Sequence, residues 1–200
     1  MSAGFLAGVV AGYGIAVPVG AIGVLIAGLS ARVSLRVGAA AGLGAATADG
    51  LYALVAVAGG AAIASLITPI ATPLRWAAAV ALLALAAVTA VGAVRGRGRP
   101  PAERGRPATP LRAYLGILGL TLLNPATVVY FAALVLGRGG AGGGVWFVAG
   151  AFLASASWQL VIAGGGSLVG RLLTGERGRL ITALTSSAVI AALALQMVVG

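Results

Sequence analysis

Apolar residues dominate the chain in six long stretches, at about residues 4–29, 37–60, 75–94, 113–136, 145–169 and 180–199. Each stretch is long enough to cross a bilayer core, which needs about 20 apolar residues in a helix. The one substantial connecting loop, at about residues 95–112, is rich in Pro, Gly and Arg, a composition that predicts no packed core. The pattern therefore predicts an all-α membrane protein with six transmembrane helices, which form a single polytopic domain over residues 1–200.

The composition leads to the same class of protein. Hydrophobic residues make up 60% of the chain and charged residues 8%, whereas a soluble domain has about 25% charged residues. The chain has no Cys and no His. Thiol nucleophiles, Ser-His-Asp catalysis, haem ligation and the usual zinc sites are therefore excluded. We expect no enzyme activity, no cofactor and no metal site.

The net charge is +10 at pH 7, but nucleic acid is not the expected partner. The basic residues are all Arg, and they lie in short loops beside apolar spans, where they orient a membrane protein. The first, third and fifth loops hold all of them except Arg75 and Arg138. The positive-inside rule places these three loops in the cytoplasm and both termini outside. The Arg-, Ala- and Gly-rich usage is typical of bacterial GC-rich coding, so we expect the bacterial inner membrane.

The six spans divide into two sets of three that resemble two copies of one unit. Because each unit has an odd number of spans, the second copy would be inverted, which is a common plan of secondary transporters. Repeat one would cover about residues 1–94 and repeat two about residues 113–200, with the cytoplasmic loop at about 95–112 between them. Pro18 lies in the middle of span one, and Asn124-Pro125 in the middle of span four. We expect helices one and four to be interrupted at Pro18 and Pro125, although either proline alone is also explained by a simple kink.

Asp49 is the only carboxylate within a long apolar stretch, because Glu103 and Glu176 lie in Arg-rich connectors. A charge at membrane depth costs roughly 3 kcal/mol on insertion scales, and it usually faces a polar cavity and has a function. Tyr52 follows Asp49 by three residues, so both lie on one helix face. The alternative for Asp49 is a structural pair with a distant Arg or a backbone group. The candidate substrate-binding residues are Thr47, Asp49, Tyr52, Gly20, Asn124, Ser157 and Gln159.

Some of these residues also have purely structural explanations. Ser155 and Ser157 are equally explained by hydrogen bonds within the helix, and Gln159 by a clamp between helices. Most glycines are explained by close helix packing.

Four segments resemble one family of exporters: VPVGAIGVLIAGL, GLGAATADGLYALVAV, LTLLNPATVVYFAAL and FLASASWQLVIAGGGSL. They are similar, in this order, to motifs of the LysE family, the lysine exporter and homoserine/threonine resistance group. The resemblance implies export of amino acids or related small metabolites coupled to the proton-motive force, without enzyme activity or ATP use. The chain departs from many relatives at Ala21, where they have Pro. It also has Gln159, a position where an aromatic residue would be unsurprising.

The expected mechanism is alternating access around a site at the middle of the membrane. The carboxylate of a zwitterionic substrate would meet the interrupted helices near Gly20 and Asn124, because broken helix ends expose unpaired backbone groups. Asp49 would face the ammonium group, or bind the coupling proton when substrate is absent. Competition of a proton and a cation for one carboxylate is sufficient for antiport.

Other readings stay open beside this one. A divalent-metal exporter of similar topology needs several oxygen, imidazole or thiolate ligands, which one Asp without His or Cys supplies poorly. A membrane enzyme is disfavoured by the same lack of reactive side chains. A non-transporting accessory protein would have six continuous helices. The expected partners are the substrate, the proton and the lipid bilayer, and a homo-oligomer stays open.

Overall fold

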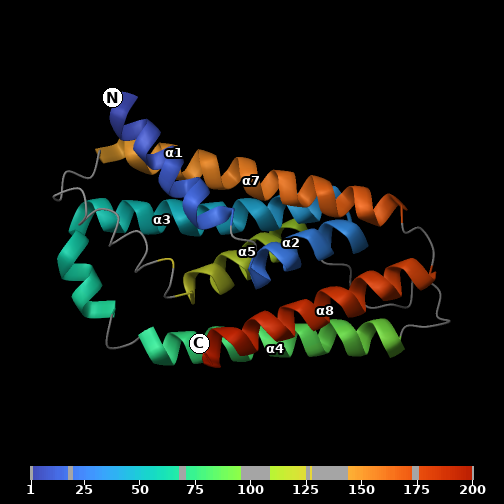
Figure 1. The fold of residues 1–200 in the computed structure, drawn as a ribbon. Coiled ribbons are helices and arrows are strands. Elements are labelled where there is room, and N and C mark those ends of the chain that lie inside the picture. Colours follow the sequence, from blue (N-terminus) through green and yellow to red (C-terminus); the bar gives the residue numbers. More distant parts are fainter. Residues whose placement is uncertain are drawn as a thin grey trace.

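The structure is a computed structural model that describes residues 2–17, 20–67, 71–95, 109–124, 127, 144–172 and 176–199. The described residues fold into helices and contain no strand, as the sequence predicts. Figure 1 shows the helices, which are α1 (Ser2–Ala16), α2 (Ala21–Arg32), α3 (Leu35–Ile67), α4 (Ala71–Arg95), α5 (Pro110–Leu122), α7 (Gly144–Leu172) and α8 (Glu176–Val199).

Two of the described helices are long and apolar enough to cross a membrane, α3 over Leu35–Gly59 and α7 over Gly144–Gly170. The bent pair α1–α2 is a third span if it is counted as one. Shorter apolar helices lie at Ala79–Arg95, Pro110–Leu122 and Ala183–Ala192. The all-helical membrane class is therefore confirmed, while the described residues show two or three clear spans rather than six. Of the stretch predicted at 113–136, residues 125–126 and 128–136 lie outside the described residues.

Span one is interrupted where the sequence predicts a break. Helix α1 ends at Ala16 and α2 begins at Ala21, and the two helices meet at a bend of 79°. Gly20 is the N-cap of α2 and has extended backbone geometry, with φ −92° and ψ −169°. In span four, α5 ends at Leu122. Pro18 and Pro125 themselves lie outside the described residues.

The end of α3 and the start of α4 differ from the predicted bounds of the second and third spans. Helix α3 continues to Ile67, beyond the predicted end at about residue 60. Helix α4 begins at Ala71 and includes Pro73 in its first turn, where a proline ring is tolerated because the first helical N–H groups have no intrahelical partner.

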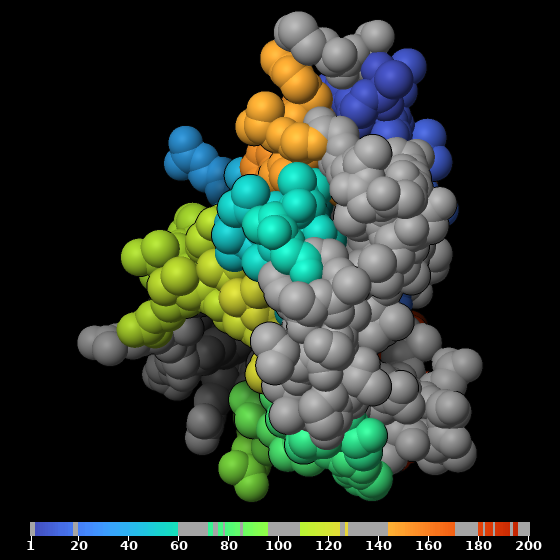
Figure 2. Space-filling view, turned by 90° about the vertical axis from the view of Figure 1, so that its left-hand side faces the viewer, coloured from blue at the N-terminus to red at the C-terminus, as the bar shows by residue number. Residues whose placement is uncertain are grey.

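The helices form three layers, with α1, α3 and α7 in the upper layer of Figure 1, α2 and α5 in the middle, and α4 and α8 below. Helix α7 packs against α1, α2 and α3, while α3 also packs against α5. Helices α4 and α8 pack against each other, and α8 reaches α2. Figure 2 shows α5 lying against α3 on one side of the molecule, with α4 at the bottom.

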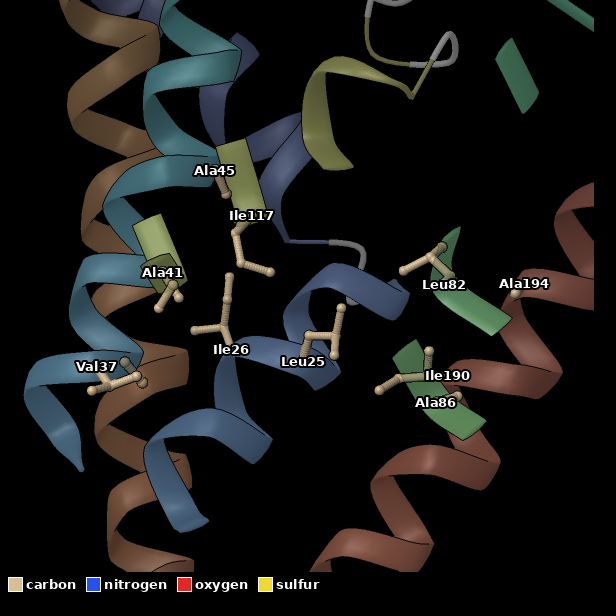
Figure 3. Close-up of a cluster of buried hydrophobic side chains, with 12 residues drawn as sticks. Leu25, Ile26, Val37, Ala41, Ala45, Leu82, Ala86, Ile117, Ile190 and Ala194 are labelled. Atoms are coloured by element: carbon tan, nitrogen blue, oxygen red, sulfur yellow. The ribbon is translucent and has the colours of Figure 1, made fainter. Parts of the chain in front are cut away.

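Helix α2 joins the layers through a cluster of buried apolar side chains (Figure 3). Ile26 lies on the side of α3 and α5, near Ala41 and Ile117. Leu25 lies on the side of α4 and α8, near Leu82 and Ile190. Short side chains in this core let the helices approach closely, as is usual where helices associate in a membrane.

Gly44 and Gly150 mark two of the close approaches between helices. A Cβ atom on Gly44 of α3 would collide with the carbonyl oxygen of Tyr114 and lie 3.2 Å from the backbone nitrogen of Leu118, both on α5. A Cβ atom on Gly150 of α7 would collide with the carbonyl oxygen of Phe5 on α1 and lie 2.9 Å from the backbone nitrogen of Val9. In both pairs the helix backbones touch directly, so glycine is required there by space.

Candidate functional site

Asp49 lies on the face of α3 that packs against α7. Its side chain is 4% exposed. The hydroxyl of Ser155, on α7, donates a hydrogen bond of 2.6 Å to Asp49 Oδ2. Among the described residues Asp49 has no ion-pair partner and no other side-chain hydrogen bond. The acid is therefore held by a neutral hydroxyl between two helices, without a cation beside it in the described part of the chain.

Tyr52 connects the face of Asp49 to the end of α5. Its phenol O–H donates to the carbonyl oxygen of Leu122, the last residue of α5. A helix end leaves its last carbonyls without intrahelical partners, and Tyr52 satisfies one of them. Asn124 lies two residues further on, and its backbone N–H donates to the carbonyl of Thr121 at 3.0 Å. Tyr52 thus links the helix that carries Asp49 to the end of α5, two residues before Asn124.

Thr47 and Ser157 each bind a carbonyl of their own helix, the alternative noted for Ser157, and a tyrosine of a neighbouring helix. The Thr47 hydroxyl donates to Leu43 of its own helix at 2.8 Å and accepts a bond of 3.0 Å from Tyr114 on α5. The Ser157 hydroxyl donates to the carbonyl of Ala154 at 2.8 Å and lies 2.8 Å from the Tyr13 hydroxyl on α1. Both hydroxyls bind a tyrosine on a neighbouring helix, and no hydrogen bond of the described residues joins either of them to Asp49.

Gly20 lies at the start of α2, at the break in span one. Its backbone is extended, and because glycine has no side chain it accepts no capping hydrogen bond from the helix. A Cβ atom at this position would meet nothing within 4 Å. No hydrogen bond of the described residues joins Gly20 or Asn124 to Asp49. The first turn of α2 carries the partial positive charge of a helix N-terminus.

Gln159 is a further buried polar residue of the α3–α7 interface, beside Asp49 and Ser155. It is 7% exposed, and its buried Oε1 atom has no hydrogen-bond partner among the described residues. Its Cβ lies 3.0 Å from where a Cβ on Gly42 of α3 would stand, so Gln159 packs directly on the α3 backbone. The neighbouring Trp158 also has a buried Nε1 atom without a partner. Buried polar atoms without partners are rare, and each calls for an explanation.

Three residues that bind the candidate side chains were not predicted as site residues. They are Ser155, which binds Asp49, and the two tyrosines Tyr13 and Tyr114. Ser155 precedes Gln159 by four residues, so a helical reading of span five places both on one face. That spacing is the signal in the sequence that could have singled out Ser155 from Ser157. No comparable spacing to a candidate residue on the same helix singles out the two tyrosines.

A comparison with known protein families identifies the chain. Residues 14–200 match the family described as LysE type translocators. No match was found among curated proteins or among solved structures. The matched segment includes every candidate residue above and both predicted helix breaks. The chain therefore belongs to the LysE type translocator family.

Proposed function

We propose that the protein is a secondary active transporter that exports amino acids or related small metabolites from the bacterial cytoplasm in exchange for protons. The observation that carries this proposal is Asp49, a buried acid whose described partner is a neutral hydroxyl. A permanent cation beside it would make the carboxylate a structural ion pair. A neutral partner instead leaves the carboxylate available to a proton or to the ammonium group of a substrate.

An inverted repeat around this acid is supported by the glycine contacts. Gly44 and Gly150 each touch a carbonyl oxygen and, four residues further along the facing helix, a backbone nitrogen. In one case α3 meets α5, and in the other α7 meets α1. Helices α3 and α5 belong to the second and fourth predicted spans, and α7 and α1 to the fifth and first. Such exchanged pairings are what two inverted units of three spans would produce.

An inverted repeat of this kind would put the Asp49–Ser155 hydrogen bond on the axis between the two repeats. Asp49 and Ser155 are 106 residues apart, which is also the separation of Gly44 and Gly150. Asp49 and Ser155 are then equivalent positions of the two repeats, and equivalent positions that touch each other lie on the axis between the repeats. An acid on that axis can be reached from either side of the membrane, as alternating access requires.

The exchange of proton and substrate would take place at this carboxylate. From the cytoplasm, the substrate ammonium displaces the proton from Asp49, while the substrate carboxylate meets the free helix end at Gly20. After the site opens outward, an external proton competes for Asp49 and releases the substrate. One acid is sufficient for this cycle because proton and ammonium cannot both be bound by the carboxylate.

The proposal is tested by neutralising the acid. Cells with and without the protein are first compared for metabolite pools inside and outside, and the metabolite that moves outward is then loaded into proteoliposomes. With an imposed pH gradient, Asp49→Asn should lower the transport rate about tenfold to a hundredfold, because a charged hydrogen-bond partner of the substrate is lost.

The matched controls are Glu103→Gln and Glu176→Gln, which neutralise the two acids outside the predicted spans and should leave transport unchanged. Gradient-driven transport by Asp49→Asn at the wild-type rate would exclude Asp49 from the mechanism. A chain that moves no metabolite in either assay would contradict the proposed function as a whole.

A further inference from the structure

Gln159 raises a question that the proposed proton exchange does not answer. Its side chain is more than nine-tenths buried, yet its amide oxygen has no hydrogen-bond partner in the described structure. An unsatisfied buried acceptor costs about 1–3 kcal/mol, so an explanation by packing alone leaves this cost uncompensated. A ligand with an N–H or O–H donor would remove it.

The position of Gln159 relative to Asp49 limits what that ligand is. Helices α3 and α7 run in opposite directions, since Gly42 faces Gln159 while Gly50 faces Phe152. Ser155, which binds Asp49, lies one helical turn before Gln159 on the same face of α7. The amide of Gln159 is therefore placed about one turn from the hydrogen bond of the acid.

Helix geometry turns the two side chains toward each other. Long side chains on an α-helix lean toward the N-terminus of their own helix. On α7 this direction leads from Gln159 toward Ser155, and on α3 it leads from Asp49 toward Gly42, which Gln159 contacts. The residues between them on α3 are Ala45 and Ala46, which are fully buried and have short side chains.

We infer that Asp49 and Gln159 together bind the ammonium group of the substrate. Gln159 makes the site selective for substrates by the number of N–H donors on that group. A primary ammonium has three donors, enough to serve the carboxylate of Asp49 and the amide oxygen of Gln159 at once. A trimethylated ammonium has the same charge but no donor. Charge alone would satisfy Asp49, whereas Gln159 would stay unpaired, and a site with an unpaired polar group rejects such a ligand.

This inference rests on the proposed function and narrows its substrates to compounds with an unblocked ammonium group. The probes are glycine, N-methylglycine, N,N-dimethylglycine and N,N,N-trimethylglycine, which share one carboxylate and one positive charge. Binding to the purified full-length protein in lipid nanodiscs is measured by the shift of its thermal unfolding temperature across a concentration series. Wild-type affinity should fall along the series, with glycine favoured over the trimethyl compound by about tenfold to a hundredfold.

The substitution Gln159→Met separates hydrogen bonding from size. Methionine keeps an unbranched side chain of similar length but has no carbonyl acceptor. The preference for glycine over trimethylglycine should shrink about tenfold in this variant, while any steric rejection of the methyl groups would persist. Ser187→Ala is the matched control, because Ser187 is another buried side chain whose oxygen has no partner, and it lies on α8. Its preference should equal that of the wild type.

An unchanged preference in Gln159→Met would overturn the inference. So would equal stabilisation of the wild type by glycine and trimethylglycine, or stabilisation by neither. These outcomes are distinguishable from failure of the proposed function, which is decided by transport in Asp49→Asn. If Asp49→Asn abolishes transport but Gln159→Met leaves the preference unchanged, only the role of Gln159 is lost.

Discussion

A single hydrogen bond between α3 and α7 holds the buried acid Asp49. Asp49 would be costly to bury alone, and Ser155 donates to it from α7 at 2.6 Å. A hydroxyl can donate to the ionised acid and can accept from the protonated one. The same partner therefore serves both forms of the carboxylate, which suits a residue proposed to gain and lose a proton in each cycle.

Removal of Ser155 tests how strongly this pair holds α3 to α7. We expect Ser155→Ala to lower the free energy of unfolding by about 1–3 kcal/mol, because Asp49 would be left as a buried acceptor without its donor. In the double variant Asp49→Asn, Ser155→Ala the effects should be less than additive, since the two residues share one interaction. Unfolding of the solubilised protein by denaturant measures all four forms of this cycle, and strict additivity would contradict a direct interaction.

At the scale of the helices, glycine positions decide which elements can touch. Gly8 and Gly12 of α1 and Gly150 of α7 each lack space for a Cβ atom. Gly166 and Gly170, further along α7, approach the backbone of α2 at Ala27 and Ala31 in the same way. Helix α7 therefore holds both halves of the interrupted span, one on each side of the 79° bend. The break near Gly20 is thus fixed in place by close packing on α7.

Gly150→Ala should destabilise the protein by about 1–3 kcal/mol, because the added methyl group collides with the backbone of α1 at Phe5. The matched control is Gly164→Ala on the same helix, where a Cβ atom meets nothing within 4 Å. There the variant should be more stable by about 0.5–1 kcal/mol, as alanine favours a helix over glycine. Thermal unfolding in detergent compares the two variants, and equal stabilities would contradict the close α1–α7 packing.

For the whole molecule, the charge distribution and the helix directions must agree. The loops rich in Arg follow the first, third and fifth predicted spans, so both termini are expected outside the cytoplasm. Helices α3 and α5 run in the same direction, because Gly44 faces Tyr114 and Tyr52 reaches Leu122. Helix α7 runs opposite to α3. These directions fit the predicted topology, in which the second and fourth spans both leave the cytoplasm and the fifth returns.

The absence of Cys from the chain makes this topology directly testable. In spheroplasts with a sealed cytoplasmic membrane, a membrane-impermeant maleimide should label Ser2→Cys without permeabilisation. It should label Glu103→Cys, in the Arg-rich loop, only after the membrane is permeabilised. Labelling of Glu103→Cys in sealed cells would reverse the orientation, and labelling of neither or both would contradict the odd–even assignment of the loops.

Much of the architecture followed from the sequence. Long apolar stretches separated by arginines predict membrane helices, because a backbone in lipid must satisfy its own hydrogen bonds. The break in span one was predicted from Pro18 and is found between Ala16 and Ala21. The spans predicted at 37–60 and 145–169 correspond to α3 and α7. Their exact ends were not predicted, since α3 continues to Ile67 through a region that, apart from Ser65, has no polar side chain to mark a helix end.

What the sequence by itself determined is the class of protein and the one acid in the membrane, since both depend on residue type and spacing along the chain. Only the tertiary structure decided the partners of the polar residues. In the structure Asp49 is hydrogen-bonded to Ser155, Thr47 to Tyr114, and Ser157 to Tyr13. The physical reason is that a helical period places a side chain on a face but does not say which helix lies opposite. That choice depends on backbone approach at residues such as Gly44 and Gly150, which becomes visible only when the helices are packed.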